Sequence, residues 1–179
     1  RDPETRRRVA RLLREAVCPL VLDADAIAVL AGKPEAIRGS ASPVILTPHP
    51  GELALLLGTN AAAIQRDRQA AAREAAERTG AIVVLKGAGT LVARAGQPAR
   101  INLTGNPGMA CGGSGDVLAG LLAGLLAQGA DPFQAACAAV WLHGTAGDSA
   151  ALRQTQTAMK AGDIAACLPD AFRMGQIGG

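Results

Sequence analysis

The residues of this sequence that could do chemistry gather in one glycine-rich turn. Gly112, Gly113 and Gly115 stand at the start of an apolar run that predicts a helix. Ser114 lies between them, and Asp116 falls in the first turn of the same helix. Backbone N–H groups in such a turn can approach an anion closely, and the positive end of the helix dipole favours negative charge there. The turn therefore predicts an anion hole that suits a phosphate group.

The Asp116 side chain is predicted to act as a base, whereas the glycines of the turn are predicted to bind the anion. Its carboxylate would repel a bound phosphate, so it is poorly suited to hold one. It is well suited to take a proton from a hydroxyl group that lies beside the phosphate. An anion hole and a general base in one turn together indicate phosphoryl transfer to a hydroxyl group.

A second candidate segment reads Lys86-Gly87-Ala88-Gly89-Thr90 and follows an apolar run typical of a buried strand. Its glycines permit the close approach of a nucleotide, and the lysine and threonine can hydrogen-bond it. A plain β-turn with a surface lysine explains the same residues and stays open as the alternative. The segment is not a P-loop, because the order G-x-x-x-x-G-K-[ST] is missing.

His49 and Glu52 stand in a third segment, the stiff TPHPGE run that follows another buried strand. A functional histidine and the plain start of a helix, with Glu52 complementing the helix dipole, explain this run about equally well.

Asp23 and Asp25 follow a further strand and could hold a metal or a sugar hydroxyl, but helix capping is the favoured role for at least one of them. His143 lies in an apolar helix, which favours a core or interhelical histidine over a catalytic one.

The elements that must position these residues alternate between short apolar strands and helices. Buried strands are expected at residues 20–22, 44–46 and 81–85, and this alternation predicts a parallel α/β sheet. Ligands of such sheets bind at the carboxyl ends of the strands. We therefore expect Asp23, His49 and Lys86 to converge on one rim that the glycine turn also faces. With no repeat or linker in the sequence, residues 1–179 are predicted to form a single domain.

The remaining elements follow from caps, breakers and periodicity. Further strands are expected at 91–93 and 100–103, and frayed residues at 175–179. Helices are expected at residues 3–17 (capped by Asp2), 26–31, 52–57, 60–79 (between Asn60 and Gly80), 114–129, 132–151 and 160–169.

Composition narrows the class of protein. The chain has 179 residues, of which 49% are hydrophobic, so it is long enough for one domain with a real core. A net charge of +3 and few aromatic residues argue against nucleic-acid binding. The arginines near the start of the chain are interpreted as a solvated helix face. No apolar run reaches the roughly 20 residues that a membrane span needs, and no signal peptide is visible.

The cysteines and histidines point to a reducing compartment and away from a metal centre. Four scattered cysteines, none in a C-x-x-C pair, fit free thiols, and a cytoplasmic location is expected. Cys111, inside the glycine turn, is interpreted as a packed small residue and not as a nucleophile. With only two histidines, neither at ligand spacing, no protein-held metal is predicted.

Five separated segments also occur together, and in this order, in a known family. VLDADAIAVL, LTPHPGE, VVLKGAGTLVA, NPGMACGGSGDVLAGLLAGLLAQG and AVWLHGTAGD resemble the ADP- or ATP-dependent NAD(P)H-hydrate dehydratases of the ribokinase-like superfamily. The resemblance implies a three-layer sandwich with a mostly parallel central sheet flanked by helices. It also places this chain as the larger, C-terminal portion of the family domain, because a G-P-G-L-G loop that helps to bind the hydrate lies just before the matching region. Family members usually carry threonine where this chain has Cys111 and Ser114.

The resemblance implies an activity in the repair of nicotinamide cofactors. ADP would phosphorylate the added hydroxyl of the S-form of hydrated NADH or NADPH, and loss of phosphate would regenerate the reduced cofactor and leave AMP. Mg²⁺ is expected with the nucleotide, and a homo-oligomer, a tetramer in the family, is expected as the assembly.

The same resemblance implies roles for individual residues. Lys86, Gly87, Ala88, Gly89 and Thr90 would contact the adenine nucleotide, and Gly115 would lie against its phosphate. Asp116 would be the base that acts on the hydrate, and His49 would contact the hydrated cofactor. Two alternatives stay open: a ribokinase-like kinase of a small alcohol such as hydroxymethylpyrimidine or hydroxyethylthiazole, and a non-catalytic fragment that binds nucleotide.

Overall fold

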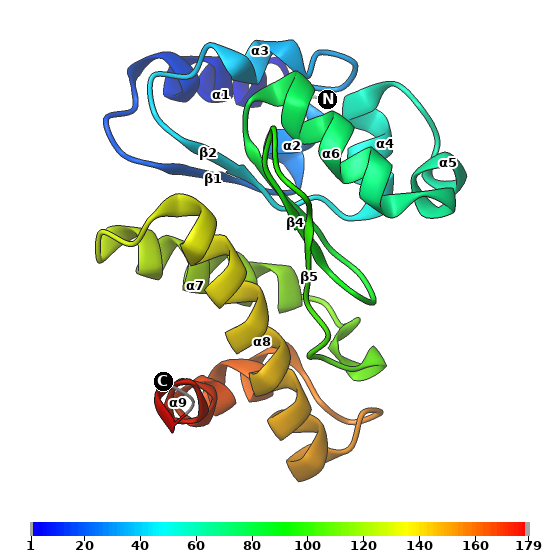
Figure 1. Cartoon of the computed structure of the whole chain (residues 1–179), viewed down its shortest axis with the longest axis vertical. Helices are drawn as coiled ribbons and strands as arrows, with labels where there is room; N and C mark the ends of the chain where they lie inside the picture. Colours follow the sequence, from blue (N-terminus) through cyan, green and yellow to red (C-terminus); the bar gives the residue numbers. More distant parts are fainter. Residues whose placement is uncertain (1, 178–179) are drawn as a thin grey trace.

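The computed structural model describes residues 2–177, which form an α/β fold around a five-stranded sheet (Figure 1). The strand order is β1-β2-β3-β4-β5. β1 pairs with β2, and β2 with β3, in parallel, while β4 runs antiparallel to both β3 and β5. Four of the five strands therefore point the same way, as the expected mostly parallel sheet requires. The strands are β1 (Leu20–Leu22), β2 (Val44–Leu46), β3 (Ile82–Leu85), β4 (Leu91–Ala93) and β5 (Arg100–Ile101).

Helices cover the sheet on both faces and make three layers (Figure 1). One face buries Leu46, Val83 and Leu85 under the first group of helices. This group comprises α1 (Pro3–Glu15), α2 (Asp25–Ala28), α3 (Glu35–Arg38), α4 (Pro50–Leu57), α5 (Ala61–Arg66) and α6 (Arg68–Thr79). The other face buries Ile45 and Val84 under α7 (Ser114–Ala127) and α8 (Pro132–Gln154). The last helix, α9 (Ala161–Ile177), packs on α8 and encloses a third cluster around Ile164.

The strands agree closely with the sequence predictions, with one difference in burial. The strands at residues 20–22, 44–46 and 91–93 are confirmed with the predicted bounds, while those predicted at 81–85 and 100–103 each differ at one end. The run at 20–22 was expected to be buried on both faces, but only Leu22 is fully buried. The reason is topological, because β1 is the edge strand of the described sheet.

The long helix predicted at residues 60–79 is wrong in one respect, because it is two helices. Asn60 and Gly80 bound the segment as expected, but Asp67 interrupts it with an extended φ of −145°. The Asp67 carboxylate accepts the N–H of Ala70 and so caps α6. An aspartate that hydrogen-bonds nearby backbone in this way competes with helix continuation.

Several helix ends also differ from the predictions. α1 is capped by Asp2 as expected but ends at Glu15, and α2 ends early, at Ala28. Helix α3 was not predicted. α4 begins at Pro50 instead of Glu52, and α9 continues through Pro169 to Ile177. The predicted fraying at 175–179 is therefore wrong for residues 175–177, which are helical, while residues 178–179 lie outside the described part of the chain.

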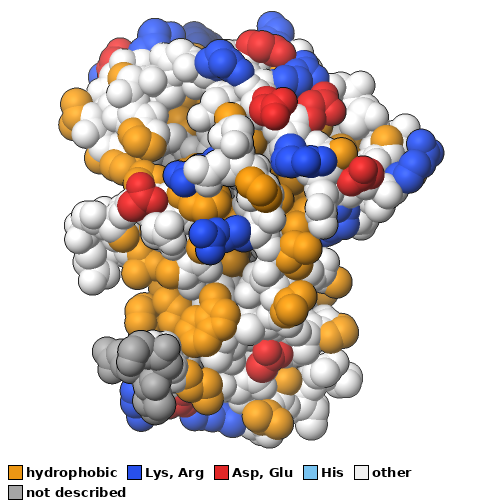
Figure 2. All heavy atoms as spheres, in the orientation of Figure 1, with side chains coloured by type: hydrophobic (Ala, Val, Ile, Leu, Met, Phe, Trp, Pro, Cys, Tyr) orange, Lys and Arg blue, Asp and Glu red, His pale blue; other side chains and the backbone are white. Residues whose placement is uncertain are grey.

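Surface character differs between the two halves of the molecule. Figure 2 shows charged side chains gathered over the upper helices of this face, and a larger share of apolar surface over the lower ones. The exposed apolar residues of α8 and α9 include Trp141, Phe172 and Met174. Within residues 2–177, no helix combines the length and hydropathy that crossing a membrane needs.

Candidate active site

An ion pair joins the carboxyl ends of β1 and β3. Lys86 Nζ lies 2.7 Å from Asp23 Oδ1 and 3.9 Å from Glu52 Oε2. All three side chains are largely buried, with the Lys86 side chain only 23% exposed. The prediction that Asp23 or Asp25 caps the next helix is wrong, because α2 has no side-chain cap. Asp23 is held by Lys86, a residue 63 positions away.

The glycine turn at residues 112–116, which we call the anion turn, faces this ion pair. A Cβ atom at Gly115 would lie 3.5 Å from Asp23 Oδ2 and 3.5 Å from Lys86 Nζ. The expected convergence on one rim is therefore confirmed for Asp23, Lys86 and the anion turn. A glycine at position 115 leaves open the space beside the lysine ammonium that a side chain would occupy.

The backbone of the anion turn presents unpaired donors. Within residues 2–177, no protein acceptor takes the N–H groups of Gly112, Gly113, Gly115 or Asp116. The first N–H groups of a helix have no partner inside the helix, and the dipole adds positive potential there. Ser114 differs, because its N–H donates to the Cys111 carbonyl at 3.3 Å. We therefore expect the glycines and Asp116, rather than Ser114, to supply the donors of an anion hole.

Asp116 projects its carboxylate from the same turn without any partner. The residue is exposed, and no hydrogen bond or ion pair to another residue between 2 and 177 engages its side chain. A carboxylate in this state is free to accept a proton from a ligand.

The Ser114 side chain points into the protein and contacts α8. Its Oγ lies 3.4 Å from His143 Nε2, and both residues are only 8% exposed. Burial disfavours the imidazolium and lowers the pKa of His143 to about 4. His143 is thus an interhelical histidine, as predicted, and it holds the first turn of α7.

The next turn of α8 accepts hydrogen bonds from the loop that leads into the anion turn. Asp148 accepts the N–H of Gly105 at 2.8 Å and Asn106 Nδ2 at 3.0 Å. A Cβ at Gly144 would collide with Thr104, so the loop and helix backbones must pack closely. The sequence reasoning missed Asp148. The signal that could have found it is the HGTAGD spacing, which puts positions 143, 144, 147 and 148 on one helix face.

The candidate nucleotide segment forms the tight connection between β3 and β4, which we call the 86–90 turn. Gly87 and Gly89 adopt φ values of +135° and +61°, which only glycine adopts without strain. Thr90 Oγ1 donates to the Gly87 carbonyl at 2.9 Å, and the Lys86 N–H donates to the Pro48 carbonyl at 2.8 Å. The turn is therefore fixed beside the loop that carries His49.

His49 caps α4, so the segment does begin a helix, as one of its two interpretations predicted, although that interpretation did not name His49 as the cap. Its Nδ1 accepts the N–H groups of Gly51 and Glu52 at 3.0 and 3.2 Å. Glu52 Oε2 in turn accepts the His49 N–H at 2.8 Å. The His49 side chain is 57% exposed, and its Nε2 lies 3.5 Å from Glu52 Oε1. Glu52 therefore links His49 to Lys86.

The described residues contain no set of ligands for a protein-held metal. Between residues 2 and 177, no group of three His, Cys, Asp or Glu side chains could hold an ion. Asp23 and Glu52, the carboxylates at the rim outside the anion turn, both face Lys86. The four cysteines are free thiols.

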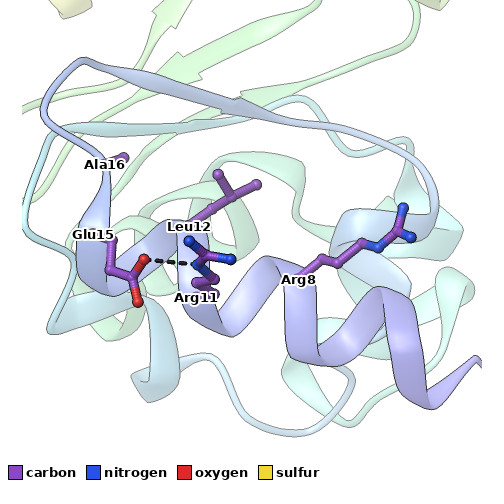
Figure 3. Close-up of a pocket in the computed structure, with 5 residues that line it drawn as sticks. All are labelled: Arg8, Arg11, Leu12, Glu15 and Ala16. Atoms are coloured by element: carbon purple, nitrogen blue, oxygen red, sulfur yellow. Dashed lines mark hydrogen bonds and ion pairs between the residues drawn. The ribbon is translucent and has the colours of Figure 1, made fainter.

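The hollows on the surface of α1 lie apart from this rim. One, of about 370 Å³, is lined by α1 and the residue after it, and none of the predicted site residues borders it (Figure 3). Arg11 forms an ion pair with Glu15 at its mouth, at 2.7 Å, and Arg8 pairs with Glu4. The interpretation of these arginines as a solvated helix face is confirmed. The lining residues are Arg8, Arg11, Leu12, Glu15 and Ala16.

The geometry of this rim agrees with the comparison to known protein families. Residues 1–170 match the NAD(P)H-hydrate dehydratase family (Carb_kinase). The chain belongs to this family. A bifunctional NAD(P)H-hydrate repair enzyme of Moorella thermoacetica is 49% identical over 173 residues, which are 97% of this chain and 33% of that protein. An ADP-dependent (S)-NAD(P)H-hydrate dehydratase of Neisseria meningitidis is 52% identical over 133 residues, 73% of this chain and 45% of that protein.

Solved structures of NAD(P)H-hydrate dehydratases share the fold. The ADP/ATP-dependent enzyme of Bacillus subtilis, co-crystallised with ATP/Mg²⁺ and soaked with CoA, superposes with a TM-score of 0.84 at 34% identity. The match covers 93% of this chain and 59% of that one. A ribokinase-like superfamily protein of Enterococcus faecalis gives a TM-score of 0.78 at 28% identity, over 97% of this chain and 60% of that one. The chain therefore has the ribokinase-like fold and spans about three fifths of these structures.

Proposed function

We propose that this chain carries the active site of an ADP-dependent dehydratase that returns the S-form of hydrated NADH or NADPH to the reduced cofactor. The observation that carries the proposal is the position of Gly115 against the Lys86–Asp23 pair, with the unpaired carboxylate of Asp116 in the next position. An anion hole, a cation and a base thus meet at one rim. The Neisseria relative, which bears this activity in its name, supports the choice of substrate and donor.

The reaction assigns a separate task to each residue of the anion turn. The unpaired N–H groups of Gly112, Gly113 and Gly115 hold the terminal phosphate of ADP, and Lys86 offsets its charge. Asp116 accepts the proton of the hydrate's hydroxyl group. The hydroxyl oxygen then bonds to phosphorus as the bond to the bridging oxygen breaks and AMP leaves. The new phosphate then leaves with the carbon–oxygen bond electrons, and a proton is lost from the adjacent ring carbon, whose C–H electrons form the restored ring double bond.

The two substrates occupy opposite sides of Lys86 in this proposal. The 86–90 turn, with Ala88 exposed at its tip, binds the adenine nucleotide. His49 contacts the hydrated cofactor through Nε2, because its Nδ1 is already used in the helix cap. Mg²⁺ would come with the nucleotide and would take its ligands from the phosphate oxygens, because no group of three His, Cys, Asp or Glu side chains in residues 2–177 could hold an ion.

The assay that tests this proposal uses the complete protein that contains the chain. It is incubated with hydrated NADH, ADP and Mg²⁺, and the absorbance of reduced nicotinamide is followed. The proposal predicts recovery of NADH that depends on ADP and yields AMP. Phosphorylation of a hydroxymethylpyrimidine or hydroxyethylthiazole without any recovery would favour the kinase alternative. Binding of ADP without either reaction would favour a non-catalytic nucleotide-binding protein.

We further propose that the protein works as a homo-oligomer. The supporting observation is the exposed apolar surface of Trp141, Phe172 and Met174 on α8 and α9. A mass measurement in solution by light scattering tests this. A tetramer is the expected result, and a monomer at micromolar concentration would contradict it.

A further inference from the structure

Arg68, the first residue of α6, lies directly under the 86–90 turn. Its Nη2 donates to the carbonyls of Leu85 at 3.2 Å, Gly89 at 3.4 Å and Lys86 at 3.5 Å. Its Nη1 donates to Lys86 as well, at 3.5 Å, and to Gln65 Oε1 at 3.4 Å. One guanidinium thus donates hydrogen bonds to carbonyls at both ends of the turn.

The charge of Arg68 has no acidic partner. No carboxylate of residues 2–177 lies within 4.0 Å of its guanidinium. The residue is half-buried, and this burial lowers the pKa of its guanidinium. Another partly exposed arginine of the same helix, Arg78, is paired with two glutamates instead. A partly desolvated cation among neutral carbonyls is costly, so its position indicates a specific task.

The turn closes tightly onto this cation. A Cβ at Gly87 would lie 2.7 Å from Arg68 Nη1, so a side chain at position 87 would push the guanidinium out of its place. In a trans peptide the N–H points away from the preceding C=O. Because the Lys86 carbonyl points at Arg68, the N–H of Gly87 points away from it. That N–H has no acceptor in the described part of the chain and is free for a ligand.

We propose that Arg68 is a positioning residue that sets the peptide planes of the 86–90 turn so that the Gly87 N–H meets an acceptor atom of a bound nucleoside diphosphate. This inference rests on the proposed function, because it takes the turn as the nucleotide subsite. It assigns to Arg68 a role in nucleotide affinity and no role in proton transfer.

The test compares Arg68→Gln and Arg68→Lys with Arg73→Gln, a matched change at an exposed residue of the same helix that forms no ion pair with residues 2–177. In Arg68→Gln we expect KM for ADP to rise about tenfold, while KM for the hydrate and kcat stay near the wild-type values. Arg68→Lys, which keeps the charge but loses the planar fork, should fall in between. A purely structural role would instead lower the active fraction and hence kcat, with KM for ADP unchanged, and would overturn the proposal.

Hydrogen exchange of the nucleotide-free protein separates this inference from the proposed function. In Arg68→Gln the Lys86 amide, whose N–H donates to the Pro48 carbonyl, should exchange faster than in the wild type and in Arg73→Gln. Unchanged exchange would overturn the positioning role. If the turn loosens but the wild-type protein fails to bind ADP, the nucleotide assignment fails together with the proposed function, and only the ordering of the turn by Arg68 is upheld.

Discussion

Lys86 Nζ lies 2.7 Å from Asp23 Oδ1, so an ion pair links the carboxyl ends of β3 and β1. Asp23→Asn should lower the free energy of unfolding by about 1–2 kcal/mol, because it leaves a largely buried ammonium with only the more distant Glu52. Urea unfolding measures this. Asp25→Asn is the matched control, since it removes an exposed carboxylate two residues away that forms no ion pair in residues 2–177, and it should leave stability nearly unchanged. Equal losses in both variants would argue against a specific role for the pair.

Gly115→Ala is expected to weaken the binding of ADP without disturbing the fold. The added methyl would make ordinary contacts with Asp23 and Lys86, at 3.5 Å each, so the fold should tolerate it. It would cover the ammonium and the N–H that face the phosphate, so KM for ADP should rise about tenfold. Gly120→Ala, in the same helix and with nothing within 4 Å of the new methyl, is the control. It should stabilise the fold by roughly 0.5–1 kcal/mol and leave KM unchanged. Similar KM values in the two variants would contradict the placement of the phosphate.

His143 makes stability depend on pH in a defined window. Its pKa is lowered from 6.5 to about 4 by burial, so the unfolded chain binds the proton more readily. The contribution of neutral His143 to the free energy of unfolding is complete above pH 6.5 and is lost as the pH falls toward 4. Between pH 7 and pH 4.5 the wild type should lose roughly 2 kcal/mol more than His143→Asn, measured by urea unfolding at both values. Parallel losses in the two proteins would show that His143 titrates normally.

The sheet could be read from the sequence because its strands are short runs of apolar and β-branched residues bounded by turn signals. The helix break at Asp67 could not, because the surrounding alanine-rich window favours one continuous helix. An aspartate side chain and a continuing helix compete for the local backbone groups, and the sequence alone does not show that the Asp67 carboxylate takes the N–H of Ala70. The start of α4 at Pro50 was also not predicted, because it depends on the cap that His49 forms.

The candidate site was partly predictable for a related reason. Parallel strands bring their carboxyl ends to one edge, so the meeting of Asp23, Lys86 and the anion turn followed from the order of elements. The specific ion pair of Asp23 with Lys86 and the contacts of Arg68 with backbone carbonyls did not follow from that order. Asp23 pairs across 63 positions, and Arg68 binds backbone carbonyls, which carry no signature in the sequence. The catalytic and binding roles of Asp116, His49 and the 86–90 turn stay predictions.

The most direct test of the account is the activity of Asp116→Asn at saturating ADP. The carboxylate has no partner among residues 2–177, so the substitution should leave the fold intact. We predict that recovery of NADH from its hydrate slows by about 10²–10⁴-fold while ADP still binds with near-wild-type affinity. Glu77→Gln, which removes an exposed carboxylate of α6, should behave like the wild type. A rate for Asp116→Asn within a few-fold of the wild-type rate would contradict the assignment of Asp116 as the base.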